Sequence, residues 1–131
     1  MYSYAVQVLP LSTTDRMFLA LGCARGLRAL HRFSPDLCHR DIKSSNFLVD
    51  GQLNAKICDL ELGGVKNHGL DIHKDGLLCT WQAPEVMRSQ PATQASDIYS
   101  LGLVLWELVS GKVPFAEYGR DSDQLMYQVR R

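Results

Sequence analysis

Apolar residues recur at steps of three and four along the first third of the chain. This period is typical of an amphipathic α-helix. The polar run Ser12-Thr13-Thr14-Asp15 directly before it offers N-cap side chains, and Ser34-Pro35-Asp36 ends it. The pattern therefore predicts a helix over residues 15–31, with an apolar side made by Met17, Leu21, Ala24, Leu27 and Leu30.

Two short apolar runs follow a polar loop at residues 39–46. Phe47-Leu48-Val49 and Ala55-Lys56-Ile57-Cys58 predict two strands, and Asp50-Gly51 supplies the residue types that tolerate a positive φ in a turn. The stretch from Leu60 to Gln82 has several glycines, mixed charge and no sustained period. It predicts a long loop, and loops of that length are usually functional.

The last pattern is an almost continuous apolar run at residues 98–109. Because it is apolar on nearly every side, it predicts a helix buried within a core, with Trp106 as a core residue. Ser96-Asp97 is the expected cap, and Gly111 and Pro114 end the helix. Residues 124–131 could begin another helix. The predicted fold class is mainly α with a small β-hairpin.

Composition narrows the classes of function. The 131 residues are 46% hydrophobic and 21% charged, which is ordinary for a globular protein. Fourteen basic residues balance fourteen acidic ones, so no net charge favours nucleic acid or an anionic membrane as a partner. The apolar stretch from Leu101 to Val109 contains Glu107 and is too short to span a bilayer. Four scattered cysteines favour reduced thiols and a cytoplasmic location, which includes the intracellular part of a larger protein.

Four motifs with chemical potential follow one another in the middle of the chain. They are the loop His39-Arg40-Asp41-Ile42-Lys43-Ser44-Ser45-Asn46, then Asp59 thirteen residues later, Ala83-Pro84-Glu85, and Asp97 twelve residues after Glu85. In order and spacing they resemble the protein kinase family, whose catalytic loop reads H-R-D-x-K-x-x-N and whose activation segment closes with A-P-E. Ile-Lys-Ser-Ser-Asn and Trp-Gln-Ala-Pro-Glu resemble the tyrosine-kinase-like group, whose members mostly phosphorylate Ser or Thr.

The resemblance implies a phosphoryl-transfer site with ATP and Mg²⁺ as cofactors and a protein as substrate or partner. Asp41 would accept or orient the proton of the attacking hydroxyl. Lys43 would place positive charge beside the γ-phosphate. Asn46 and Asp59 would supply oxygen ligands to Mg²⁺, which bridges the phosphates.

Other motif residues have structural or regulatory roles in the family. His39 completes the loop motif, and Arg40 marks a loop often switched by phosphorylation of the activation segment. Thr80 is the only hydroxyl residue between Leu60 and Gln82. Glu85 pairs in the family with a later Arg, and Asp97 would hold the backbone of the catalytic loop.

Three departures from the family pattern bear on activity. No glycine-rich loop occurs in the sequence, and no Lys precedes Lys43. Glu61 stands where the family keeps the glycine of D-F-G, so it removes backbone freedom and adds a carboxylate near the phosphates. Leu77 and Leu78 occupy the places of the family's Gly-Thr pair, so Thr80 is out of register with Asp41.

The expected organisation is an atypical leader at residues 1–14 and a partial kinase domain at residues 15–131. That domain would be a C-terminal lobe with catalytic loop, activation segment and central buried helix, lacking the N-terminal lobe and the last helices. We expect a member of a Ser/Thr kinase family that is inactive by itself. The alternatives are a non-catalytic, pseudokinase-like scaffold, and complementation by an upper lobe on another chain. A metal site at Cys38-His39 is disfavoured, because no second ligand pair follows.

Overall fold

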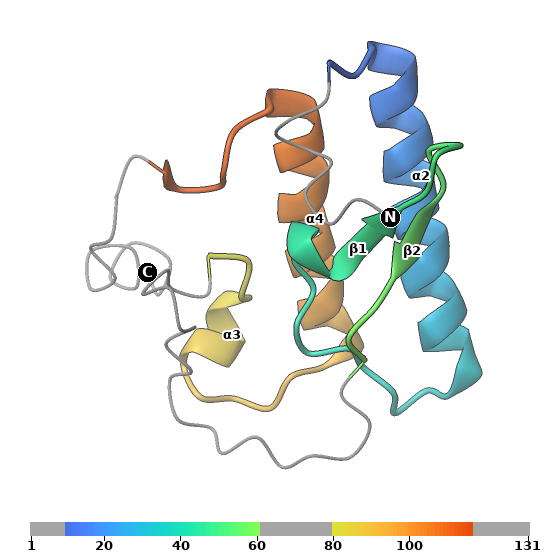
Figure 1. Cartoon of the computed structure of the whole chain (residues 1–131). Helices are drawn as coiled ribbons and strands as arrows, with labels where there is room; N and C mark the ends of the chain where they lie inside the picture. The colour runs from blue at the N-terminus through green and yellow to red at the C-terminus, as the bar shows by residue number, and fades with distance from the viewer. Residues whose placement is uncertain (1–9, 61–79, 117–131) are drawn as a thin grey trace.

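A computed structural model describes residues 10–60 and 80–116 (Figure 1). This part of the chain is mainly helical with one small two-stranded antiparallel sheet, which confirms the predicted fold class at that level. The elements are helix α2 (Thr13–Phe33), a single 3₁₀ turn η1 (Ser44–Asn46), strands β1 (Phe47–Val49) and β2 (Ala55–Ile57), and helices α3 (Pro84–Met87) and α4 (Gln94–Ser110).

Helix α2 begins at a capping box. Ser12 is the N-cap; its hydroxyl accepts from the Asp15 amide at 3.1 Å, and its own amide donates to Asp15 Oδ2 at 2.9 Å. These reciprocal bonds satisfy two amides that the helix itself leaves unpaired. The helix ends where Ser34 turns to an extended backbone. The prediction for this helix is confirmed, and the structure extends it by one half-turn at each end.

The buried side of α2 differs from the predicted one. Leu27 is buried as expected, but its buried companions are Leu19 and Cys23, whereas Met17 and Leu21 are 68% and 45% exposed. The reason is that glycines make part of the contact side. A Cβ at Gly22 would lie 3.1 Å from Ala55 Cβ, so the strand packs directly on the helix backbone. An apolar pattern cannot report such a contact.

The strands pair in the register Phe47 with Ile57 and Val49 with Ala55. The hairpin was correctly predicted, but the position of its positive φ was wrong: Leu53 has φ 63°, and neither Asp50 nor Gly51 lies in the left-handed region. The Asp50 carboxylate accepts from the Gln52 and Asn54 amides, so it organises a longer turn. The left-handed residue of this turn, Leu53, comes near its end.

Helix α4 begins one turn earlier than its predicted cap. The N-cap is Thr93, and Ser96 is the third helical residue of its capping box. Gly111 ends the helix with φ 68°, as predicted. The prediction of burial on all sides was wrong, because only one side faces other described elements: Ile98, Trp106 and Val109 are 55%, 45% and 76% exposed. Trp106 is therefore not a core residue in the described part of the chain.

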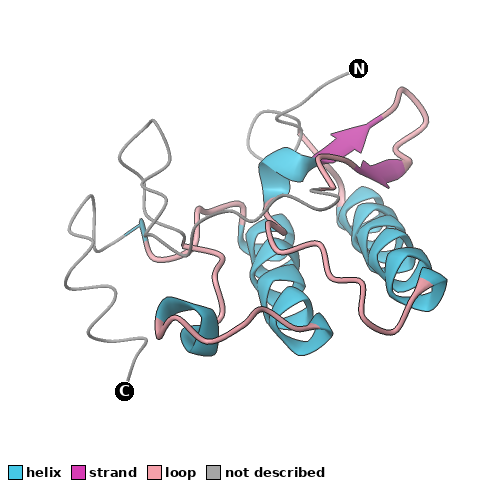
Figure 2. Ribbon diagram, turned by 90° about the horizontal axis from the view of Figure 1, so that it is seen from below, coloured by secondary structure: helices cyan, strands magenta, loops and turns pink. Residues whose placement is uncertain are grey.

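Helices α2 and α4 lie side by side and run in opposite directions (Figures 1 and 2). At one end the Arg16 guanidinium donates to the Leu108 carbonyl, and at the other His31 contacts Asp97. The hairpin lies across α2, and β1 adds Phe47 and Val49 to the core. Side chains from both helices and the hairpin thus form one apolar core, which fixes the ends of the loop between α2 and β1.

Helix α3 was not predicted. It opens with Pro84 in its first turn, where a missing amide hydrogen does no harm. Most of the predicted long loop, with Glu61, Leu77 and Leu78, lies outside the described residues, as does the possible helix at residues 124–131.

Candidate active site

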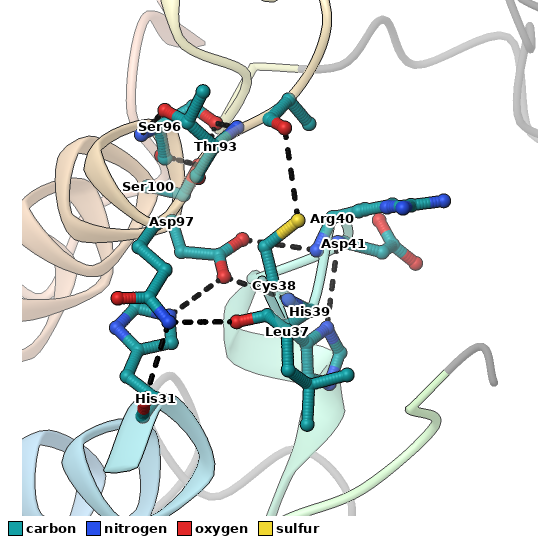
Figure 3. A network of polar contacts seen from close by, with 12 residues as sticks. His31, Leu37, Cys38, His39, Arg40, Asp41, Thr93, Ser96, Asp97 and Ser100 are labelled. Carbon is teal, nitrogen blue, oxygen red and sulfur yellow. Dashed lines mark hydrogen bonds and ion pairs between the residues drawn. The ribbon is translucent and has the colours of Figure 1, made fainter. Parts of the chain in front are cut away.

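The Asp97 side chain holds the backbone of the loop that follows α2 (Figure 3). Its carboxylate is buried at 2% exposure; Oδ2 accepts from the His39 amide at 2.7 Å and Oδ1 from the Arg40 amide at 2.9 Å. Hydrogen bonds to a carboxylate are stronger than neutral ones. Arg40 has φ 72°, a conformation unfavourable for a residue with a Cβ. Two bonds from a buried carboxylate therefore stabilise a strained loop.

His31, on the last turn of α2, is a third contact of this carboxylate. Its Nε2 lies 2.9 Å from Asp97 Oδ2. Beside it, the Gln94 amide nitrogen donates to backbone carbonyls at the end of α2 and in the following loop, including that of Leu37 at 3.0 Å. The sequence motifs missed both residues. The only signal for His31 was its place in the basic last turn of one helix, opposite the acidic first turn of the next, and this match appears only once the helices pack antiparallel. Gln94 gave no signal.

The His39 ring connects the loop to the end of β2. It is fully buried, and its Nε2 lies 2.8 Å from the Cys58 carbonyl oxygen, which can only accept. Its Nδ1 accepts from the Asp41 amide at 3.3 Å. Both ring nitrogens thus have a hydrogen-bond partner. The ring joins the backbone of Asp41 to the residue before Asp59.

The Lys43 and Asn46 side chains both lie within hydrogen-bonding distance of Asp41. Lys43 Nζ is 2.8 Å from Asp41 Oδ2. The Asn46 amide nitrogen donates to the Asp41 carbonyl oxygen at 2.7 Å and to Oδ2 at 3.1 Å. The Asp41 and Lys43 side chains are 27% and 18% exposed and reachable from solvent, whereas Asn46 is buried at 4% exposure.

The hairpin brings Asn46 and Asp59 to the same edge. The Cys58 amide donates to the Asn46 carbonyl oxygen at 2.9 Å, directly before Asp59, which is exposed and has φ 59°. An amide oxygen and a carboxylate are hard donors of the type that Mg²⁺ prefers. By donor type Asn46 and Asp59 are compatible with Mg²⁺, the metal that the sequence implies.

Cys38 and His39 have other partners than a metal. The Cys38 thiol contacts the Ala92 carbonyl oxygen at 3.7 Å, and His39 is engaged as described above. Within residues 10–60 and 80–116, no three His, Cys, Asp or Glu side chains gather closely enough to hold a metal ion. The same two stretches contain no helix with the length and apolar character needed to cross a membrane.

The hydrogen bonds described above for Asp41, Lys43 and Asn46 do not involve Thr80 or Glu85. Thr80 is 7% exposed, and its hydroxyl finds no hydrogen-bond partner within the described ranges. Glu85 stands in the first turn of α3. Burial raises the pKa of the Tyr99 hydroxyl, and the negative charge of Glu85 adds to that rise. Within the described residues the Thr80 hydroxyl therefore makes no hydrogen bond to Asp41.

Glu107 is a further polar residue that the motifs missed. Its carboxylate is 1% exposed and accepts from the Ser44 hydroxyl at 3.1 Å and from the Trp81 indole nitrogen at 3.2 Å. The sequence signal was a single acidic residue within the apolar run of α4. A charge at such a place is seldom buried unless it has partners.

Comparisons with known proteins identify the family. The family model described as "Protein kinase domain" matches residues 3–130, so the chain belongs to the protein kinase family. The chain is 39% identical to serine/threonine-protein kinase CTR1 of Arabidopsis thaliana over 76% of its length, and 40% identical to dual specificity protein kinase shkA of Dictyostelium discoideum over 84%. Dual specificity protein kinase shkC of Dictyostelium discoideum is 42% identical over 79%.

These matches confirm the resemblance to serine/threonine kinases of the tyrosine-kinase-like group. The chain spans only a small part of these relatives: 12% of CTR1 and 21% of both shkA and shkC.

Proposed function

We propose that residues 15–131 form the catalytic-loop lobe of a serine/threonine protein kinase domain, which transfers the γ-phosphoryl group of ATP to hydroxyls of proteins in the cytoplasm. The carrying observation is the grouping of Asp41, Lys43 and Asn46, with distances of 2.8 and 3.1 Å to one carboxylate oxygen. Phosphoryl transfer depends mostly on positioning and charge neutralisation, and this loop is fixed by buried bonds. The names of the relatives support hydroxyl acceptors on proteins.

Each residue of the group has a distinct part in this proposal. Asp41 orients the acceptor hydroxyl and takes its proton. Lys43 keeps a positive charge beside the carboxylate, where the phosphoryl group would arrive. Asn46 and Asp59 hold Mg²⁺, which supplies charge neutralisation to the phosphates when it is bound. Asn46 also ties Asp41 in place through its amide nitrogen.

We also propose that these 131 residues, tested by themselves, bind Mg²⁺-ATP weakly. They contain no glycine-rich loop and no Lys ahead of Lys43, and Glu61 adds negative charge beside the expected place of the phosphates. A thermal-shift assay with Mg²⁺-ATP tests this, with Asp59→Ala as the matched variant. We expect no measurable rise in melting temperature for either protein. A clear rise that depends on Asp59 would contradict the proposal.

The catalytic roles are tested by grafting residues 38–60 into the kinase domain of CTR1. We expect the graft to phosphorylate casein, and Asp41→Asn within it to lower the rate by about 10²–10⁴-fold, the usual contribution of a general base. Asp50→Asn is the control, because Asp50 organises only the hairpin turn. A graft that folds but stays inactive would contradict the assigned roles.

A second function is a non-catalytic scaffold. The exposed apolar side of α4, with Ile98, Trp106 and Val109, favours it, because large exposed apolar areas often bind partners. The graft separates the two functions: an active graft that needs Asp41 supports the kinase, and a folded graft without activity supports the scaffold.

A further inference from the structure

The side of α2 that points away from α4 carries one stripe of exposed side chains. In Figure 2 α4 lies beside α2 and the hairpin lies over it, so the remaining side of α2 faces no other described element. Positions three, four and seven residues apart share one side of a helix. The exposed residues at these spacings form what we call the outer stripe of α2: Met17, Phe18, Leu21, Arg25, Arg28 and Arg32.

The chemistry of the outer stripe changes half-way along the helix. Met17 and Phe18 are 68% and 62% exposed, and Leu21, one turn later, is 45% exposed. From Arg25 to the end of α2 the stripe is basic. The apolar half and the basic half therefore follow one another along the helix axis.

The needs of folding do not account for the three arginines. Arg25 and Arg28 are three residues apart, Arg28 and Arg32 are four apart, and like charges at these spacings destabilise a helix. The helix dipole favours a cation only in the last turn, which accounts for Arg32 alone. Within residues 10–60 and 80–116 no carboxylate forms an ion pair with any of the three. An anionic partner would relieve their mutual repulsion.

The order of the two halves distinguishes between kinds of partner. A second α2 packed in parallel would set arginines against arginines, and one packed antiparallel would set arginines against Met17 and Phe18, so the stripe is not self-complementary. Helices that lie on a membrane separate apolar and basic residues around the axis, so that each kind runs the whole length. In α2 they are separated along the axis. The pattern favours a protein segment with the complementary order.

We propose that the outer stripe of α2 binds an antiparallel helical segment of another protein, acidic in its first half and apolar in its second half. Antiparallel packing sets the acidic half against the three arginines and the apolar half against Met17, Phe18 and Leu21. Carboxylates in the first turns of the partner also suit its own helix dipole. Apolar side chains at three- and four-residue steps anchor such a helix on a partner surface.

The test measures the binding of two fluorescent synthetic peptides to the full 131-residue chain by fluorescence anisotropy. The first peptide, about 20 residues long to span the stripe, carries Glu in its N-terminal half and Leu and Phe at helical steps in its C-terminal half. The second has the same composition with the halves exchanged. We expect the first peptide to bind roughly tenfold more tightly than the second, and added salt to weaken its binding. Equal affinities, or no binding of the first peptide, would overturn the proposal.

Variants of the stripe show whether the peptide binds there. Arg25→Gln combined with Arg28→Gln should weaken binding of the first peptide by roughly tenfold, because two charge pairs are lost. Met17→Ser should weaken it through loss of apolar contact. Lys56→Gln is the matched control: it removes a cation from β2 whose side chain is 62% exposed, and it should leave the affinity unchanged. Circular dichroism checks that each variant keeps its helices. Binding that none of the stripe variants alters would overturn the proposal.

Two further measurements cover the other partners. Vesicles of phosphatidylserine and phosphatidylcholine present an anionic membrane, and analytical ultracentrifugation of the chain alone reports self-association. We expect no binding that depends on Arg25 and Arg28 in the first measurement, and no dimer that depends on them in the second. Such binding to vesicles without binding of the first peptide would overturn the proposal in favour of a membrane surface. A dimer that Arg25→Gln with Arg28→Gln disrupts would overturn it in favour of a second copy.

Discussion

At the scale of single residues, the site depends on buried carboxylates of α4 that accept hydrogen bonds from the loop at residues 39–46. Asp97 accepts from two successive amides, of which Arg40 has a left-handed backbone. That conformation is unfavourable by roughly 1–2 kcal/mol for a residue with a Cβ. The free energy for holding it comes from contacts with residues more than fifty positions away.

Asp97→Asn tests this arrangement. An amide keeps one acceptor oxygen but presents N–H hydrogens to a backbone amide or to His31, so a buried donor loses its partner. We expect the free energy of unfolding to fall by about 3 kcal/mol. Urea denaturation measures it, with exposed Asp36→Asn as the control that should stay within about 0.5 kcal/mol of the parent. A similarly small effect for Asp97→Asn would show that the carboxylate is dispensable.

Thr80 gives a prediction of opposite sign. Its buried hydroxyl has no partner among the described residues, and Val has nearly the same shape without the polar atom. We expect Thr80→Val to raise the free energy of unfolding by about 1 kcal/mol. Thr93→Val is the matched comparison, because the Thr93 hydroxyl caps α4, and it should lower that energy by about 1 kcal/mol. A loss for Thr80→Val would mean that its hydroxyl is paired.

At the scale of elements, two glycines of α2 face β2 at different distances. A Cβ on Gly22 would stand 3.1 Å from Ala55 Cβ and 3.2 Å from Ala55 N, whereas the closest atom to a Cβ on Gly26 is Ile57 Cβ at 3.7 Å. The second distance is an ordinary contact, and the first requires the strand to move. The approach of hairpin and helix is therefore limited by Gly22.

Gly26→Ala should stabilise the protein by about 0.5–1 kcal/mol, because Ala loses less backbone entropy on forming a helix interior. Gly22→Ala brings the same gain in backbone entropy but displaces the backbone of β2, so we expect the protein to be less stable than the parent. Thermal melts of the two variants side by side provide the measurement. Equal stabilisation by both variants would show that β2 can move away from Gly22 without loss of stability.

The same elements show how far the sequence could predict the structure. Helix periods and turn residues placed α2, the hairpin and α4, and motif spacing singled out Asp41, Asn46 and Asp97. Three features were out of reach because they depend on packing: the glycine side of α2, the exposed side of α4, and the left-handed residue at Leu53. The same holds for the site partners His31, Gln94 and Glu107, which contact the loops only once both helices are in place.

At the scale of the whole molecule, the core contains a thiol. Burial raises the pKa of Cys23 from 9.0 to about 12. The thiol sits between Leu19 and Leu27 on the buried side of α2. In the unfolded chain it ionises near its ordinary pKa, so the folded state binds a proton that the unfolded state releases.

Stability should therefore decline in alkali. The contribution of Cys23 is fully present below about pH 8.5 and is lost as the pH rises toward 12, with a slope of at most about 1.4 kcal/mol per pH unit. Denaturation curves between pH 8 and 10.5 measure it, and Cys23→Ala should flatten the slope. The pKa values of Cys58 and Tyr99 are also raised by burial, so part of the slope should remain in that variant. An identical slope with and without Cys23 would contradict this assignment.

The bonds from Asp97 to the loop also have a consequence for synthesis. The Arg40 amide and the carboxylate that fixes it are 57 residues apart. A ribosome adds about 5–20 residues per second, so the loop waits roughly 3–11 s between its own emergence and that of its partner. During this interval no Asp97 carboxylate is present to stabilise the left-handed backbone of Arg40. We therefore expect the nascent chain to form α2 and the hairpin from local contacts first, and the loop at residues 39–46 to take its final shape only when α4 packs against α2.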